Sequence, residues 1–298
     1  MNFLETINVV KHYSGHLALD SVSISVPGQK IFGLLGPNGS GKTTLLRIIN
    51  RITAPDSGEI LFLGRPSRHS DIFRIGYLPE ERGLYRKMKS GDQAVYLARL
   101  KGLTARDATA RLRTLFRRFD LLPAWNKTPE ELSKGIQQKL QFIITVVHEP
   151  ELLIFDEPFS GFDPLNTELL KNEILRLREE GKTIIFSTHN MPSVDEICDE
   201  TAFLNRSKIV LSGSVESIRN RFRQHIFRLT TTTPLSASPS VCEILSQQPL
   251  HSTYLSRVRK NPSISSSEFL TLLIRNNSLL SFEEEFPSMH DIFIQTVS

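Results

Sequence analysis

The sequence predicts an α/β fold built around a parallel sheet, in a chain of 298 residues that can form one large domain or two modest ones. Three observations support this prediction. Strand-like and helix-like segments alternate over the first two thirds of the chain. A glycine-rich loop joins an apolar strand directly to a helix, and short apolar runs have the character of strands buried on both faces.

The elements of the first two thirds follow from local patterns and turn signals. Strands are expected at 7–10, 21–26, 30–35, 60–63, 152–155 and 183–187, with a final pair at 201–205 and 208–211. Helices are expected at 42–49 and 166–179. Between 90 and 148 the apolar residues recur at helical spacing, which predicts a helical region there.

The composition changes after about residue 215, and residues 231–240 are rich in Ser, Thr and Pro. We therefore expect a first domain at 1–215 and a small α/β appendage at 216–298. The appendage is expected to contain strands at 226–231, 252–258 and 279–283 and helices at 241–247, 268–276 and 289–297. A partly disordered tail is the alternative, which the recurring apolar clusters disfavour.

The overall composition excludes several classes of protein. Apolar residues make up 39% and charged residues 23%, which fits a packed globule, and a net charge of +4 is too small to indicate a nucleic-acid binder. No apolar run approaches the ~18 residues of a spanning helix, and the N-terminus lacks a signal-peptide pattern. Cys198 and Cys242 are the only cysteines, which argues against a disulfide framework. A reduced, cytoplasmic setting is expected.

The clearest motif is a phosphate-binding loop that fits G-x-x-x-x-G-K-[ST] between an apolar strand and a helix. It comprises Gly36, Pro37, Asn38, Gly39, Ser40, Gly41, Lys42, Thr43 and Thr44. Glycines allow backbone N–H groups to surround phosphate oxygens, and the helix N-terminus adds partial positive charge. Lys42 can reach the β- and γ-phosphates, and the Thr43 hydroxyl can bind Mg²⁺. The alternative is an ordinary tight glycine turn.

Two carboxylates complete this pattern at the end of the apolar run 152–155, in a strand expected to neighbour the one before the loop. Asp156 is placed to hold the hydrated Mg²⁺, and Glu157 is placed to orient and polarise an attacking water. A solvated turn is the alternative for two such acids. The phosphate-binding loop on the same chain makes that alternative the weaker one.

With these motifs in order, residues 1 to about 215 resemble the ATP-binding subunit of an ABC transporter. The resemblance implies a P-loop NTPase core of the ABC type, with an antiparallel β subdomain and a helical subdomain at about 88–148. It further implies ATP and Mg²⁺ as cofactors. The implied reaction is the hydrolysis of ATP to ADP and phosphate, coupled to transport.

The same resemblance assigns roles to residues outside the loop. Tyr13 stands where the family stacks an aromatic ring on adenine, although core packing is the alternative for a lone Tyr. Ser133 and Gly135 belong to the family's signature loop, here Leu-Ser-Lys-Gly-Ile, and would contact the γ-phosphate held by the opposite subunit. Asp163 lies in the loop that joins the two sites of the dimer. His189 matches the histidine that contacts the γ-phosphate.

Three residues depart from the family pattern. Glu80 replaces the usual Gln, and as a carboxylate it can still bind Mg²⁺ or its water shell, although it adds negative charge near the phosphates. Lys134 and Ile136 replace the usual Gly and Gln of the signature loop. The residues Lys42, Asp156, Glu157 and His189 are all present, so hydrolysis is expected.

The stretches 77–85 and 287–293, together with the Leu-Ser-Lys-Gly signature, resemble the branch of sodium-extrusion-type and related export ATPases that carry a small C-terminal domain. This resemblance implies a homodimer, a separate integral membrane permease, and a position on the inner face of the cell membrane. One alternative is a soluble ABC-type ATPase that acts on DNA or ribosomes, which typically has a coiled-coil insertion or two ATPase units. The other is a nucleotide-dependent regulator without hydrolysis, which the intact Glu157 and His189 disfavour.

The predicted helical region is strongly basic. From residue 82 to residue 127 the chain carries twelve Lys or Arg and three Asp, a net charge of +9. By resemblance this region faces the membrane subunit, so contact with anionic lipid is a hypothesis, whereas no nucleic-acid partner is expected. A solvated helical surface is the alternative. Charge reversal at Arg111, Arg113, Arg117 and Arg118 is the test that the sequence suggests.

Overall fold

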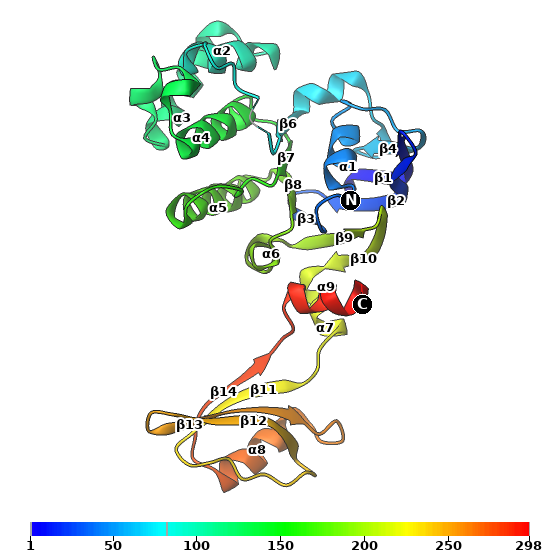
Figure 1. Cartoon of the computed structure of the whole chain (residues 1–298), viewed down its shortest axis with the longest axis vertical. Helices are drawn as coiled ribbons and strands as arrows, with labels where there is room; N and C mark the ends of the chain where they lie inside the picture. The colour runs from blue at the N-terminus through cyan, green and yellow to red at the C-terminus, as the bar shows by residue number, and fades with distance from the viewer. Residues whose placement is uncertain (1, 82, 298) are drawn as a thin grey trace. The chain divides into compact units, whose positions relative to one another are not determined.

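The computed structural model describes residues 2–81 and 83–297, and the chain divides into two compact units (Figure 1). One unit runs to Val215 and also takes in the end of the chain from Thr296, and the other spans Glu216–Gln295. Arg82, one of the basic residues counted above, lies outside the described residues. The predicted α/β fold with a helical part and a C-terminal addition is confirmed.

A six-stranded sheet forms the centre of the first unit, in the order β10-β9-β3-β8-β7-β6. Its strands are β3 (Ile31–Leu35), β6 (Ile75–Leu78), β7 (Leu152–Asp156), β8 (Thr183–Thr188), β9 (Glu200–Asn205) and β10 (Lys208–Ser214). All neighbours pair in parallel except β10 with β9. The sequence analysis placed β7 next to β3, and this was wrong because β8 lies between them.

A second, antiparallel sheet packs on the first helix of this unit. It has the order β2-β1-β4-β5 and consists of β1 (Asn2–Tyr13), β2 (His16–Pro27), β4 (Ser57–Phe62) and β5 (Arg65–Pro66). Leu4, Ile24 and Phe62 from these strands share one buried cluster with Leu46 of α1 (Lys42–Ile49) and Leu34 of β3. The phosphate-binding loop is thereby fixed between two packed layers.

The helical region consists of α2 (Ser90–Leu100), α3 (Ala105–Arg118) and α4 (Lys134–Val146), which lie together at one end of the unit in Figure 1. The helix α3 starts where the Thr104 hydroxyl accepts from the Asp107 N–H at 3.1 Å. It buries Ala108, Leu112 and Phe116, which recur every four residues on one face. The helices α5 (Pro164–Glu179) and α6 (Met191–Ile197) alternate with the central strands.

The second unit contains an antiparallel sheet in the order β12-β13-β11-β14. Its elements are β11 (Ile226–Thr231), β12 (Cys242–Leu250), β13 (Thr253–Lys260), α8 (Ser266–Asn276) and β14 (Leu279–Glu285), flanked by α7 (Val215–Arg221) and α9 (Met289–Val297). The predicted helix at 241–247 was wrong. Cys242 and Ile244 pair with β13 at Lys260 and Val258. Cys242 is buried in one cluster with Phe269 and Leu273 of α8, whereas Ile244 is exposed.

No helix within residues 2–81 and 83–297 is long and apolar enough to cross a membrane.

Candidate functional site

The candidate site lies where four parallel strands end. The strand β3 leads into the phosphate-binding loop, β7 ends at Asp156, β8 is followed by His189, and β6 is followed two residues later by Glu80. Because the carboxyl ends of parallel strands meet at one edge of the sheet, segments far apart in the sequence converge here. This edge is the usual location of ligand sites in open α/β sheets.

Two glycines of the loop are required by its shape. Gly36 has φ +153°, and a Cβ there would lie 2.1 Å from the carbonyl oxygen of Leu204. Gly41 has φ +111°, and a Cβ there would lie 2.4 Å from the carbonyl oxygen of Ala18. The helix α1 that follows has neither a side-chain cap nor an acidic residue in its first turn. Its backbone N–H groups and partial positive charge are therefore suited to an anion.

Lys42 is enclosed within the loop, with 6% of its surface exposed. Its ammonium group donates to the carbonyls of Gly36 at 2.8 Å and Pro37 at 3.2 Å, and it lies 3.9 Å from Glu157 Oε1. Burial lowers the pKa of Lys42, while the nearby Glu157, Asp156 and Glu80 oppose that shift. The site therefore holds one buried cation near three carboxylates.

Glu157 is held in a fixed orientation. Its φ is +49°, an unusual value for a residue with a side chain, and its N–H donates to the carbonyl of Ser187 at 3.1 Å. One carboxylate oxygen lies 2.7 Å from His189 Nδ1, and the other accepts from the Thr188 hydroxyl at 3.2 Å. Glu157 is buried, whereas the His189 side chain is 55% exposed, so the histidine borders the open side of the site.

Asp156 has the features expected of a metal-binding carboxylate. It is buried, one oxygen accepts from the Ser187 hydroxyl, and the other is buried without a hydrogen-bond partner among the described residues. The same holds for the hydroxyl oxygen of Ser40. Burial and then Asp156 raise the pKa of the neighbouring Tyr77 to about 12, so that phenol stays protonated.

The oxygens of Asp156 and Ser40 fit a hydrated Mg²⁺ that is bound mainly by phosphate. Mg²⁺ commonly uses one or two protein carboxylates and takes its other ligands from substrate phosphates and water. Within the described part of the chain, no three His, Cys, Asp or Glu side chains converge as a preformed metal cage. The unsatisfied oxygens of Asp156 and Ser40 are the atoms left to receive such a hydrated ion.

A cavity of about 320 Å³ unites most of the predicted residues. It is lined by Tyr13, His16, Ala18, Asn38, Gly39, Gly41, Lys42, Thr43, Thr44, Glu80 and Glu157. Tyr13 is 41% exposed, so its ring borders the cavity and is not part of the core. Glu80 is exposed on the same cavity, where its carboxylate replaces the amide that the family usually has.

Three predicted residues lie apart from this cavity. Ser133 precedes α4 and accepts from the Ile136 N–H, and Gly135 lies in the first turn of that helix. Asp163 caps α5 by accepting from the Asn166 N–H at 2.9 Å. A Cβ on Gly135 would lie 3.5 Å from the Asn166 side-chain nitrogen, so the starts of α4 and α5 are neighbours.

The starts of α4 and α5 form an exposed surface, which we call the signature face. It comprises Ser133, Lys134, Gly135, Ser160, Gly161, Asp163 and Leu165. The amide of Gln138 donates to the carbonyl of Ser160 and links its two parts. Leu165 is 85% exposed, an unusual position for a large apolar side chain at a helix start.

The sequence analysis missed Ser187, Thr188 and His16. Ser187 contacts both acidic residues, since its hydroxyl donates to the Asp156 carboxylate and accepts from the backbone N–H of Glu157 at 3.3 Å. A signal for Ser187 and Thr188 existed: both end a buried strand directly before His189, and β7 and β8 are adjacent, with Asp156 opposite Ser187. His16 is the first residue of β2, directly after the turn at Ser14 and Gly15, and nothing in the sequence singles it out.

Comparison with known sequence families gives two main matches. The profile of the ABC transporter family matches residues 19–160. The profile of the C-terminal domain of DrrA1-3-like ATP-binding proteins matches residues 213–297. A third profile, described as an AAA domain of a putative AbiEii toxin of a type IV toxin–antitoxin system, matches residues 126–196.

Individual proteins agree with the family profiles. The ABC transporter ATP-binding protein YhaQ of Bacillus subtilis is 43% identical over 97% of this chain and 97% of its own length. The ABC transporter ATP-binding protein NatA of Bacillus subtilis is 33% identical over 67% of this chain and 83% of its own. Among solved structures, an ATP-binding subunit of an ABC transporter superposes with a TM-score of 0.68 at 28% identity, covering 74% of this chain and 93% of that one.

Proposed function

Because this chain belongs to the ATP-binding proteins of the ABC transporter family, which bind and hydrolyse ATP, we propose that two copies enclose two ATP molecules and drive a separate membrane subunit. Each ATP would lie between the phosphate-binding loop of one copy and the signature face of the other. Closing and reopening of the dimer would then be the step that moves the membrane subunit.

The observation that carries this proposal is the separation of the site into two surfaces. The cavity around Lys42 contains the loop, Glu80 and Glu157, but neither Ser133 nor Gly135 lines it. The signature face is exposed and includes Leu165 at 85% exposure. A second copy placed head to tail would supply these groups and cover Leu165.

The chain's own residues suit phosphoryl transfer to water. Lys42 and the start of α1 would bind the β- and γ-phosphates, and Tyr13 would stack on adenine. Glu157 would accept a hydrogen bond from a water placed in line with the γ-phosphate. His189, now in contact with Glu157 at 2.7 Å, would donate to the γ-phosphate. Asp163 would bridge the two copies.

We assign the Mg²⁺ to Thr43 and Asp156, with Glu80 as an outer ligand or water partner. When bound, the ion neutralises charge on the phosphates. The Asp156 oxygen that has no hydrogen-bond partner would bind the hydrated ion. The hydroxyl of Ser187 orients the carboxylate by donating to its other oxygen. Glu80 adds a negative charge that the usual Gln lacks.

The variant Gly135→Glu tests whether a second copy completes the site. Its Cβ would meet only Asn166 at 3.5 Å, and an acidic residue in the first turn stabilises a helix, so the fold should persist. The new carboxylate would face the γ-phosphate held by the other copy. We expect ATP turnover to fall by about 100-fold or more, whereas nucleotide affinity of the single chain should stay unchanged.

A matched control is Ser267→Glu, which adds the same charge at the same position of the exposed first turn of α8. This variant should retain full turnover. If Gly135→Glu hydrolyses ATP at the normal rate, the assignment of a trans contact to Gly135 is incorrect. If its melting temperature falls with its activity, the loss reflects unfolding, and Gly135→Ala replaces it in the assay.

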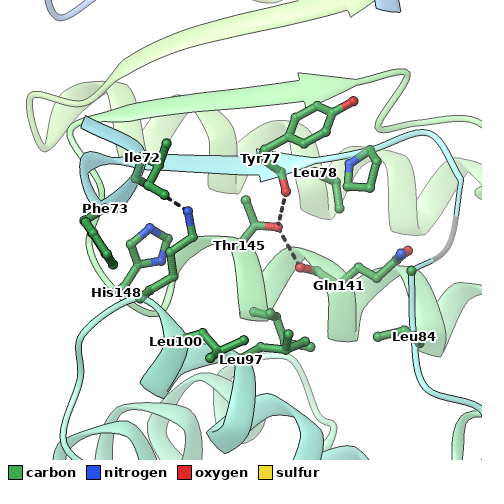
Figure 2. A pocket seen from close by; sticks show the side chains of 14 residues that line it. Ile72, Phe73, Tyr77, Leu78, Leu84, Leu97, Leu100, Gln141, Thr145 and His148 are labelled. Atoms are coloured by element: carbon green, nitrogen blue, oxygen red, sulfur yellow. Dashed lines mark hydrogen bonds between the residues drawn. The ribbon is translucent and has the colours of Figure 1, made fainter. Parts of the chain in front are cut away.

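The docking site proposed for the membrane subunit is a cleft of about 310 Å³ on the helical region (Figure 2). Leu97 and Leu100 of α2 and Gln141 and Thr145 of α4 face it, and the chain on both sides of β6 closes it. The cleft is largely apolar and reaches Pro79, the residue directly before Glu80. A segment that moves in this cleft would therefore shift Glu80 in the ATP site through the adjacent backbone.

One end of the cleft is polar and suggests what the docking segment carries. Lys101 donates to the carbonyls of Ile72 at 2.7 Å and Ile75 at 2.8 Å, and burial lowers its pKa. Burial, followed by the nearby Lys101, lowers the pKa of His148 to about 4, so the imidazole is neutral at physiological pH. No acidic residue is among the described residues that line the cleft. An apolar segment with one carboxylate for Lys101 fits best.

The variant Leu100→Asp tests the cleft. Leu100 is 56% exposed, so the change should not unfold the chain, but a segment docked there would bury the new charge. We expect binding to the membrane subunit that accompanies the wild-type chain to weaken about tenfold or more, with the basal ATPase rate unchanged. The control Ile274→Asp alters a residue of α8 that is 57% exposed. Equal binding by both variants would exclude the cleft as the docking site.

The direction of transport proposed here is export. It rests on the resemblance of 77–85 and 287–293 to export ATPases and on the match of residues 213–297 to the DrrA1-3-like domain. The chain would act at the cytoplasmic face of the membrane, held there by its partner. In vesicles that contain both subunits, ATP on the side of this chain should drive substrate from that side of the membrane to the other, and transport in the opposite direction would contradict export.

A further inference from the structure

We propose that a basic and aromatic surface beside the cleft binds the headgroups of anionic phospholipids. This surface, called the lip, comprises Tyr85, Arg86, Lys87, Lys89, Tyr96 and Arg99. The proposal rests on the proposed function only in that the membrane subunit brings the cleft close to a bilayer. Lipid binding itself is a property of this chain alone.

The structure separates the basic residues of the helical region into two groups. Several are engaged internally: Arg111 pairs with Glu149 at 3.2 Å, Arg118 pairs with Glu173 at 3.0 Å, and Arg113 stacks over the Trp125 ring at 3.9 Å. Reversing these three would disrupt packing and ion pairs, so the test suggested by the sequence is unsuitable. Arg86, Lys87, Lys89 and Arg99 are exposed, and none forms an ion pair with another described residue.

The lip is an ordered surface. The side-chain oxygen of Gln93 accepts from the Tyr85 N–H at 3.2 Å, and its nitrogen donates to the Met88 carbonyl at 3.1 Å, which holds 85–89 against α2. The rings of Tyr85 and Tyr96 meet edge to face, with centroids 6.4 Å apart. Tyr96 and Arg99 are three residues apart and so share one face of α2.

The chemistry of the lip suits a bilayer surface. The lip carries four exposed cations, and Asp92 is the acidic residue in the first turn of α2. Lys and Arg near a membrane are attracted by anionic headgroups, and exposed tyrosines, here 53% and 45%, are typical of the headgroup level.

The lip also continues into apolar surface at the margin of the cleft. Leu84 and Leu97, next to Tyr85 and Tyr96 in the sequence, line the cleft, and Phe73 and Leu100 at its margin are 48% and 56% exposed. A protein surface that combines exposed cations, tyrosines and apolar side chains matches the polar and apolar layers of a membrane interface. An acidic protein segment would pair with the cations but would leave the tyrosines and apolar side chains without a partner.

The experiment measures sedimentation of the full chain with phosphatidylcholine vesicles, with and without phosphatidylglycerol, at low and high salt. The test variant carries Lys87→Glu, Lys89→Glu and Arg99→Glu. The matched control carries Arg68→Glu, Arg206→Glu and Arg275→Glu, three exposed cations elsewhere that form no ion pair with described residues. Both changes alter the net charge equally. Each basic residue near an anionic surface contributes about fivefold, so the test variant should bind roughly 100-fold more weakly.

The expected result is binding of wild type and control to phosphatidylglycerol vesicles, lost at high salt, with little binding of the test variant. Tyr96→Ser should weaken binding while leaving the salt dependence unchanged, since the ring carries no charge. Equal loss in test and control variants would mean a net-charge effect and would overturn the proposal. The proposal would also be overturned if the wild type bound equally well with and without phosphatidylglycerol. The same conclusion would follow if the lip residues were needed for binding to pure phosphatidylcholine membranes that contain the membrane subunit. The ATPase rate, measured in parallel, reports on the proposed function separately and should be equal in all variants.

Discussion

The variant Glu157→Gln is expected to lose ATP turnover by a factor of about 100 to 10,000, while ATP binding persists. Glutamine has the shape of the native side chain and can keep the hydrogen bond from Thr188, so the buried site should remain folded. An amide cannot act as a carboxylate toward water, and hydrolysis should stop. Phosphate release and nucleotide binding, measured on the same preparation, check both parts.

The matched control for this change is Glu168→Gln, at an exposed position of α5. It removes the same charge outside the cavity and should leave turnover unchanged. Near-normal hydrolysis by Glu157→Gln would remove Glu157 from the proposed role. If Glu157→Gln loses nucleotide binding as well as turnover, Glu157 instead maintains the structure of the site.

The variant Lys42→Ala should lose nucleotide affinity by more than about tenfold, or about 1.4 kcal/mol. Lys42 is the cation enclosed by the loop, and its ammonium group also donates to the carbonyls of Gly36 and Pro37. The loss should be larger for ATP and ADP than for AMP, because Lys42 is placed for the β- and γ-phosphates. Titration with the three nucleotides measures this difference.

Lys208→Ala is the control for Lys42→Ala, since Lys208 is exposed and pairs only with Asp20 among the described residues. Its nucleotide affinities should match those of the wild type. A change below tenfold at Lys42 would contradict our account of the loop. An equal loss for AMP would point to collapse of the loop instead of loss of a phosphate contact.

The sequence predicted the fold and most of the cavity because the motif carries its own geometry. The loop with Gly36 and Gly41 fits a motif that joins a strand to a helix, and the short apolar run before Asp156 is typical of a buried strand. Once both strands are parallel in one sheet, their carboxyl ends must meet at one edge. Tyr13 and Glu80 were assigned to the site by resemblance, and the structure places both on the cavity that the loop lines.

Other features depend on contacts that a linear pattern does not encode. The strand order placed β8 between β3 and β7, which made Ser187 the partner of Asp156. The segment Cys242–Leu250 has apolar residues at spacings compatible with a helix. It forms a strand because it pairs with β13, a contact that the local pattern does not encode. Which arginines are engaged follows from residues such as Glu149 and Glu173, distant in sequence.

The roles of Ser133, Gly135 and Asp163 could be predicted only by resemblance. Within one chain, Asp163 caps α5 and Ser133 caps α4, so both have structural tasks that would explain their presence without a second copy. Gly135 is not among the glycines with positive φ, and a Cβ there would make only an ordinary contact with Asn166 at 3.5 Å, so the single chain gives no steric reason for glycine there. This makes Gly135 the residue that best separates the two explanations.

The most direct test of the account is the mass in solution of Glu157→Gln with ATP and Mg²⁺, measured by light scattering. We predict twice the mass of one chain with ATP, the mass of one chain without it, and the mass of one chain in both conditions when Gly135→Glu is added. A mass that does not depend on ATP, or a dimer that survives Gly135→Glu, would contradict a site shared head to tail between two copies.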